Sequence, residues 1–93
     1  MTDANGPRAI FVQFKCEMGK AYEVAARLVD DLDIVPEVYS TSGPYDLIAR
    51  FHLDHDQDPG LFVTEILQRI EGVAETYTTI GFNAFTPRQR PRT

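Results

Sequence analysis

The stretch VYSTSGPYDLIARF, residues 38–51, decides the expected fold because two strand-forming runs lie on either side of a tight turn. β-branched and aromatic residues favour strands on both sides, and Gly43-Pro44 is a strong signal for chain reversal. The turn also brings hydroxyls, a phenol and a carboxylate together within residues 42–46. A turn that only reverses the chain needs the glycine and the proline, but it does not need Tyr45 and Asp46. We therefore expect this loop to contact a small ligand.

Strand and helix patterns alternate along the rest of the sequence. Every second residue of 9–16 is apolar, which indicates a strand with one apolar face. Asp58 and Pro59 are typical of a helix start, Gly72 is typical of a helix end, and Pro36 favours an edge strand. The second helix is expected to face inward through Phe62, Val63, Ile66, Leu67 and Ile70. The predicted strands are 9–16, 34–42, 45–53 and 73–85, and the predicted helices are 21–32 and 59–71.

This order, βαββαβ, predicts an α+β fold of the ferredoxin-like type, with a four-stranded antiparallel sheet and two helices on one face. The sheet face without helices should be polar if a single copy is stable alone. Instead it carries Phe11, Ile48 and either Tyr39 or Tyr77 among charged residues. A second copy of the chain would cover such a face. We expect a homodimer packed sheet to sheet.

Charge and composition exclude several classes of protein. The 93 residues form one domain with a net charge of −5, and residues 1–87 carry six basic and 14 acidic residues, a net charge of −8. Binding to nucleic acid requires clustered Lys and Arg, so we expect no direct nucleic-acid contact. Neither a signal peptide nor a membrane-spanning run is present, and the one cysteine, Cys16, lies in an apolar strand pattern. We expect a soluble cytoplasmic protein without membrane contact.

The histidines and the cysteine give no catalytic or metal-binding signature. His52 and His55 lie near three aspartates, but their spacing matches no known set of metal ligands. Cys16 and the histidines lie on different predicted elements, without the spacing of a nucleophile and its base. We therefore expect no enzyme, no metal and no cofactor.

The stretch from Ala9 to Phe85 resembles the effector-binding (RAM) domain of the Lrp/AsnC family of regulators. The resemblance rests on the opening strand AIFVQFK (9–15), EMGK (17–20), VPEVY (35–39), SGPYDLI (42–48) and IEGVAETYTTI (70–80). The Gly-x-Tyr-Asp turn, followed about 25 residues later by the Thr-rich strand, is more specific than either part alone. Composition predicts a flexible N-terminal segment at 1–8 and a basic, disordered tail at 87–93. The resemblance implies an Lrp/AsnC-type ligand-binding domain at 9–86.

In this family the domain forms a dimeric α/β barrel, and dimers associate into rings, here expected as an octamer or a decamer. Small effectors, usually free amino acids, bind in clefts between dimers near the turn and the last strand. An amino acid needs an anion for its ammonium group and N–H or hydroxyl donors for its carboxylate. Carried over by position, the ligand-binding residues are Ser42, Gly43, Tyr45, Asp46, Thr76, Thr78 and Thr79.

Each of these residues also has a structural interpretation. Asp46 could cap its own turn, Tyr45 could pack at the start of a strand, and Gly43 could serve backbone geometry alone. The threonines are good strand residues on propensity alone. Both interpretations stay open at this point.

Full-length regulators of the family carry an N-terminal helix-turn-helix, whereas here only eight residues precede the first strand. The sequence therefore indicates a stand-alone domain that acts through partners, such as a full-length Lrp/AsnC regulator. Two alternatives share the fold. A small cofactor-free monooxygenase would use His52 in a pocket inside each protomer, and an ACT-type amino-acid sensor would have a glycine such as Gly19 after the first strand.

Overall fold

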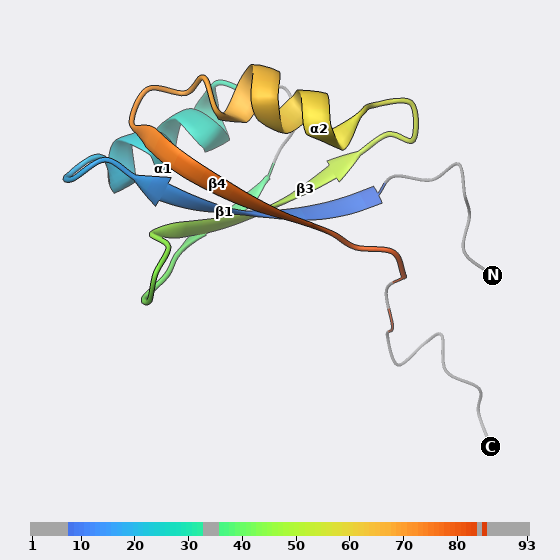
Figure 1. Ribbon diagram of the computed structural model, residues 1–93, viewed down its shortest axis with the longest axis horizontal. Coiled ribbons are helices and arrows are strands. Elements are labelled where there is room, and N and C mark those ends of the chain that lie inside the picture. The colour runs from blue at the N-terminus through green and yellow to red at the C-terminus, as the bar shows by residue number, and fades with distance from the viewer. Residues whose placement is uncertain (1–7, 33–35, 84, 86–93) are drawn as a thin grey trace.

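The computed structural model describes residues 8–32, 36–83 and 85, and it has the predicted βαββαβ order. The four strands form one antiparallel sheet in the order β2-β3-β1-β4, and the helices lie on one side of it (Figure 1). The elements are β1 (Arg8–Cys16), α1 (Ala21–Asp30), β2 (Glu37–Ser40), β3 (Leu47–Leu53), α2 (Pro59–Phe62), the π-helix η1 (Val63–Leu67) and β4 (Val73–Ile80).

The core lies between the sheet and the helices. Alternation along β1 and β3 sends every second side chain into it, as the sequence predicts. Phe51 of β3 meets Phe62 of α2 edge-on, with ring centroids 5.1 Å apart. The fully buried side chains are Ile10, Val12, Phe14, Val24, Leu28, Phe51, Leu53 and Leu67. These strand and helix positions hold the turn at residues 42–46 against a rigid sheet.

The second helix begins as predicted but does not continue as an α-helix. Asp58 Oδ1 accepts the N–H groups of Gly60 at 2.8 Å and Leu61 at 3.4 Å, which caps α2. From Val63 the helix widens into η1, and it ends before the predicted boundary at residue 71. A π-turn adds one residue between hydrogen-bonded groups, which changes the direction in which later side chains point. Ile66, predicted to face inward, is 41% exposed as a result.

Several predicted boundaries also differ. α1 ends at Asp30 and not at residue 32, and β3 begins at Leu47 and not at residue 45. Arg8 belongs to β1 and not to a flexible segment. β2 is confirmed as an edge strand, but it ends at Ser40, two residues before the predicted end, and one further backbone bond, from the Thr41 N–H to the Asp46 carbonyl, leads into the turn. β4 ends at Ile80, and a further backbone bond, from the Gly81 N–H to the Ala9 carbonyl, continues the pairing with β1 by one residue. The predicted tail at 87–93 and positions 34–35 lie outside the described residues.

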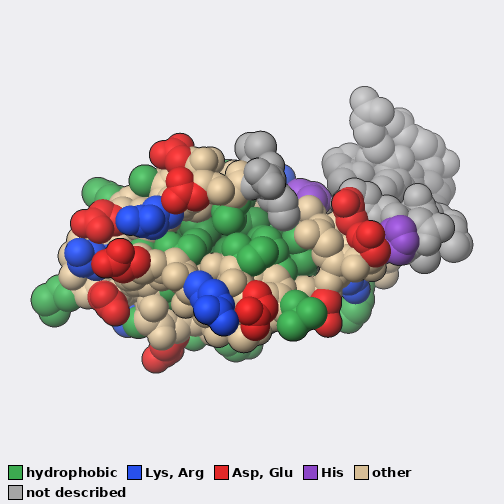
Figure 2. Space-filling view, turned by 90° about the horizontal axis from the view of Figure 1, so that it is seen from above, with side chains coloured by type: hydrophobic (Ala, Val, Ile, Leu, Met, Phe, Trp, Pro, Cys, Tyr) green, Lys and Arg blue, Asp and Glu red, His purple; other side chains and the backbone are tan. Residues whose placement is uncertain are grey.

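The helix side of the molecule is a charged rim around an apolar centre (Figure 2). Ion pairs such as Arg69 with Glu65 at 3.3 Å lie on this rim and are solvent-exposed, so each contributes little to stability. Within the described part of the chain, no helix is long and apolar enough to span a membrane.

The sheet face opposite the helices, called the open face from here on, is partly apolar. Strand register places Tyr39, Ile48, Gln13 and Tyr77 in one row across all four strands. Tyr39 is 61% and Tyr77 56% exposed, although both are large aromatic residues. The next row contains an ion pair between Arg50 and Glu37 at 2.9 Å. The open face therefore combines exposed aromatic rings with charges, as the sequence predicts.

Candidate functional site

Two hydrogen bonds hold the turn at residues 42–46 against the end of β1, one from the Asp46 backbone and one to the Asp46 side chain. The Asp46 N–H donates to the Phe14 carbonyl at 2.8 Å, and Asp46 Oδ2 accepts the Cys16 N–H at 2.8 Å. The ladder between β1 and β3 ends at the pair Phe14 and Leu47. Asp46 precedes β3, and its side chain therefore satisfies the next backbone donor on this side of β1, which the ladder leaves unpaired.

Further hydrogen bonds close the turn on itself. Thr41 donates its N–H to the Asp46 carbonyl at 3.0 Å and its hydroxyl to the Tyr45 carbonyl at 2.9 Å. Lys15 Nζ donates to the Pro44 carbonyl at 3.2 Å. These contacts hold the loop in one conformation, so that its exposed groups need little reordering when a ligand binds.

Gly43 occupies the exposed tip of the turn beside Ser42. Its φ of +105° lies in the region that side chains rarely adopt, and an added Cβ would meet nothing within 4 Å. Backbone geometry therefore requires the glycine, whereas packing does not. This agrees with the structural interpretation of Gly43 and leaves room above the turn.

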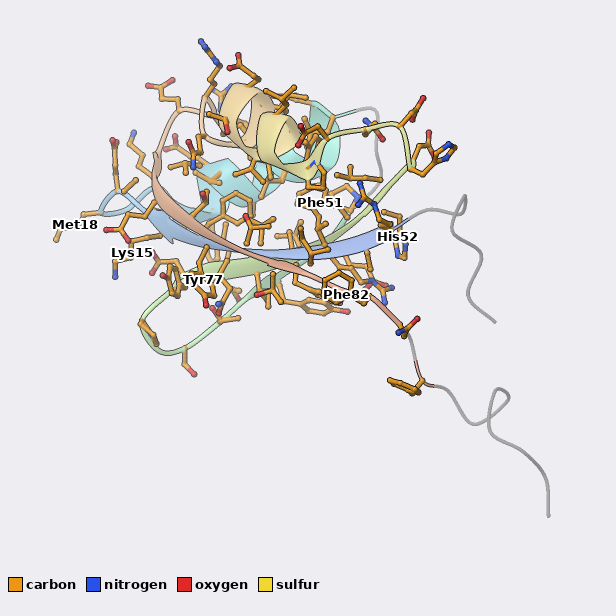
Figure 3. The ribbon with its side chains drawn as sticks, turned by 45° about the vertical axis from the view of Figure 1, so that its right-hand side comes forward. Lys15, Met18, Phe51, His52, Tyr77 and Phe82 are labelled. Atoms are coloured by element: carbon orange, nitrogen blue, oxygen red, sulfur yellow. The ribbon has the colours of Figure 1, made fainter. Side chains whose placement is uncertain are left out.

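Tyr45 and Tyr77 form an aromatic wall at this end of the sheet. Their ring centroids lie 6.2 Å apart with a 33° tilt. Figure 3 shows Tyr77 and Lys15 on the side of the sheet away from the helices. Tyr77 was absent from the predicted ligand residues, although strict alternation along the last strand places it on the open face.

The structure does not gather the predicted threonines with the turn. Thr76 and Thr78 pair with Phe14 and Val12, so they lie on the helix side of β4, while Thr79 lies on the open face. Thr76 Oγ1 also accepts a hydrogen bond from Gln68 Nε2 at 2.8 Å. The turn joins β2 to β3, and β1 lies between β3 and β4. Within one chain, strand register therefore places the hydroxyl-bearing side chains of β4 on two different faces, Thr76 and Thr78 on one and Thr79 on the other.

Asp46 does not cap its own turn through its side chain. Its Oδ2 serves the neighbouring strand, and its Oδ1 accepts no hydrogen bond from the residues that the structure describes. The residue is half-buried at the base of the loop. One carboxylate oxygen is thus committed to the fold, and the other remains available to a cation.

Burial raises the pKa of the Cys16 thiol, the nearby charge of Asp46 raises it further, and Lys15 partly opposes both effects. The thiol is therefore neutral at physiological pH and a poor nucleophile. We expect Cys16 to resist alkylation at about pH 8 in native buffer and to react fully in denaturant. Equally fast alkylation in both conditions would contradict its burial.

The same shift makes stability depend on pH. As the pH rises past the ordinary thiol range, near 8.5, the unfolded chain loses a proton that the folded chain keeps. The Cys16 contribution to the free energy of unfolding is therefore complete below this range and falls above it. Urea unfolding from about pH 7 to 10 should show a steeper loss of stability for the wild type than for Cys16→Ala.

His52 does not form the enclosed site that an enzyme of this fold would require. Its side chain is exposed, and Figure 3 shows it near the far end of the sheet from Met18 and Lys15. Among the residues that the structure describes, no three His, Cys, Asp or Glu side chains are grouped as a metal site.

Comparison with known proteins bears on these alternatives. The family model of the Lrp/AsnC ligand binding domain matches residues 9–91. The HTH-type transcriptional regulator FL11 of Pyrococcus furiosus is 37% identical over 70 residues, which are 75% of this chain and 45% of that protein. The chain thus spans less than half the length of this curated relative, which is a transcriptional regulator.

Solved structures give the same result. FFRP-DM1 superposes with a TM-score of 0.72 at 28% identity, over 81% of this chain and 99% of that one. The regulator NMB0573 of Neisseria meningitidis, solved as an L-Met complex, has a TM-score of 0.72 at 16% identity, over 88% and 54% of the two chains, and shows likeness of fold. The family match, the regulator relative and the shared fold agree with the strand order and turn described above: the chain belongs to the Lrp/AsnC ligand-binding domain family.

Proposed function

We propose that the chain is an effector-binding and oligomerisation module that binds a free amino acid and modulates transcription through a partner protein. The observation that carries this proposal is the turn at residues 42–46, which is fixed to β1 while Asp46 Oδ1 accepts no hydrogen bond from any described residue. A regulator with the same fold binds L-Met. This supports amino acids as the class of ligand.

Asp46 binds the ammonium group of the effector in this proposal. A half-buried carboxylate with one free oxygen forms a stronger charge-assisted hydrogen bond than a fully exposed one. Gly43 contributes its exposed backbone at the tip, and the ring of Tyr45 gives the ligand side chain an apolar surface. Ser42 adds a hydroxyl beside them.

The threonines complete the site from another subunit. Thr76, Thr78 and Thr79 lie on β4, and β1 separates this strand from β3 and the turn. In this proposal the ligand lies between copies of the chain, where the threonine hydroxyls of one copy donate to its carboxylate. Effector binding and assembly are then coupled, because only the assembled form has the whole site.

Assembly begins with a homodimer through the open face, and dimers associate further into an octameric or decameric ring. The exposed rings of Tyr39 and Tyr77 support this contact. A full-length Lrp/AsnC regulator, which shares the domain, is the proposed partner for the output signal. In such a mixed assembly this chain contributes effector sites, and the regulator contributes DNA binding.

Thermal melting against a panel of free amino acids tests the proposal. A hundredfold excess over Kd should raise the Tm by about 10 °C or more. Asp46→Asn keeps an oxygen acceptor for the Cys16 N–H but removes the charge, so we expect this variant to keep its ligand-free Tm and lose the ligand shift. Asp46→Ala should lose the ligand shift and, because it leaves the N–H unpaired, about 1–3 kcal/mol of stability as well.

Modified ligands provide the control for the panel. An N-acetyl amino acid lacks the ammonium group and should give no shift, whereas its free form does. A full shift with the N-acetyl compound, or with Asp46→Asn, would exclude Asp46 as the ammonium ligand. If no amino acid raises the Tm and the protein is stably assembled, the module assembles without binding an amino-acid effector.

A further inference from the structure

The residues after β4 carry two large apolar side chains that their own chain leaves in water. Gly81, Phe82, Asn83 and Phe85 are called the aromatic arm here. Phe82 is 84% exposed and Phe85 is 87% exposed, whereas the other described phenylalanines are buried or half-buried. Two exposed phenylalanines within four positions are unfavourable in water, since each ring can bury 150–250 Å², about the largest area per side chain. They indicate a contact with another molecule.

The arm leaves the sheet on the side of the open face. In Figure 1 the chain after β4 runs away from the helices, and Figure 3 shows Phe82 on the side of the sheet opposite them. Gly81 fixes this exit: its N–H donates to the Ala9 carbonyl at 2.8 Å, and an added Cβ would lie 3.4 Å from the ring of Phe11, an open-face residue.

The arm does not cover the open face of its own chain, because the rings of Phe82 and Phe85 are almost fully exposed. The open face in turn exposes Tyr39 and Tyr77, and Ile48 and Phe11 lie half-buried between them. The same chain therefore carries an apolar projection and an apolar surface on one side of the sheet, and neither covers the other. A second copy of the chain, related by a twofold axis, carries the same arm and the same open face, so the arm of each copy can meet the open face of the other.

We propose that the aromatic arm is an intersubunit clasp: Phe82, supported by Phe85, packs on the open face of a second copy of this chain. This proposal rests on the sheet-to-sheet homodimer proposed above and adds to it. Two arms exchanged around one axis give two equivalent contacts, and each arm extends the apolar area beyond the sheets. The row formed by Tyr39 and Ile48, flanked by the Arg50–Glu37 pair, offers rings and a methyl surface for Phe82.

The absence of tryptophan from the sequence makes a direct test available. Phe82→Trp retains an aromatic ring and gives the protein a single tryptophan, which lies in the arm. As the protein concentration is raised through the dimer Kd, the emission maximum of the tryptophan should shift to shorter wavelength. The midpoint of this shift should fall at the same concentration as the midpoint of dimerisation measured by sedimentation. Met18→Trp is the matched control: Met18 is 99% exposed at the other end of the molecule, and its emission should stay constant.

A second measurement separates the clasp from the dimer itself. Phe82→Ala should weaken dimerisation about 30-fold, as expected for an aromatic residue at an interface hot spot, while Met18→Ala leaves the Kd unchanged. Phe82 is exposed in the single chain, so this variant keeps the core intact. The open-face variant Ile48→Asp serves as the reference for loss of the sheet contact.

Each outcome decides a different point. A normal Kd for Phe82→Ala together with dissociation of Ile48→Asp would overturn the clasp and retain the sheet-to-sheet dimer. Weakening by Phe82→Ala with no effect of Ile48→Asp would also overturn it, because the arm would then bind elsewhere. A wild-type protein that is monomeric at high concentration would overturn the clasp and the proposed dimer together.

Discussion

Gly72→Ala is expected to lower the free energy of unfolding by about 4 kcal/mol. Gly72 follows η1 and has a φ of +100°. A Cβ at this position would lie 2.9 Å from Cγ2 of Val24, a fully buried core residue, and 3.2 Å from Cβ of Lys20. The substitution therefore combines an unfavourable backbone conformation with a clash against α1. The Gly72 carbonyl also accepts the Glu17 N–H at 2.8 Å, so any shift of this backbone disturbs the β1–α1 turn.

Gly43→Ala is the matched control, because Gly43 has a similar φ of +105° but open space around its Cβ position. Only the backbone term applies there, so we expect a loss of about 1–2 kcal/mol. Urea unfolding followed by circular dichroism measures both. Equal losses at the two positions would show that the contact with Val24 is accommodated. The double variant with Val24→Ala should be less unstable than the sum of the two single variants.

Ile48→Asp is expected to raise the Kd of the homodimer more than 100-fold. Ile48 lies on β3 between Tyr39 and Gln13 in the central row of the open face. An unpaired carboxylate at the middle of a sheet-to-sheet contact loses water without gaining a partner, which costs several kcal/mol. Because the side chain points away from the core, circular dichroism of the variant should remain that of a folded protein.

Sedimentation velocity over a concentration series measures this effect. Tyr22→Asp places the same charge on an exposed residue of α1, on the helix side of the sheet, and should leave the Kd unchanged. Dissociation by Tyr22→Asp, or an intact Ile48→Asp dimer, would place the dimer contact on another surface.

Local patterns in the sequence predicted most of the fold. Alternation in 9–16 placed the buried face of β1, and the Asp58-Pro59 pair located the start of α2 to the residue. The π-turn at Val63–Leu67 was missed because its residues also fit an α-helix. Its backbone spacing depends on packing against the sheet, which composition does not reveal. The exposure of Ile66 follows from that one change.

The candidate site was only partly predictable. The turn and its carboxylate were evident from Gly43 to Asp46, but the Cys16 N–H that binds Asp46 lies 30 positions earlier and is reached only through the pairing of β1 with β3. The two-residue period of a strand already separates Thr78 from Thr79. The family resemblance carried them over as one group, and alternation alone would have divided them between the faces.

The position of β1 has a consequence for synthesis. The strand made first lies in the middle of the sheet, and its two neighbours, β3 and β4, come later in the chain. Ile10 meets its β4 partner only when Ile80 has been made. During translation β1 therefore presents unpaired backbone groups and an apolar face until β3 and β4 have been made. Such long-range pairing also slows folding after release, so β1 is the segment that a nascent-chain chaperone has the most reason to hold.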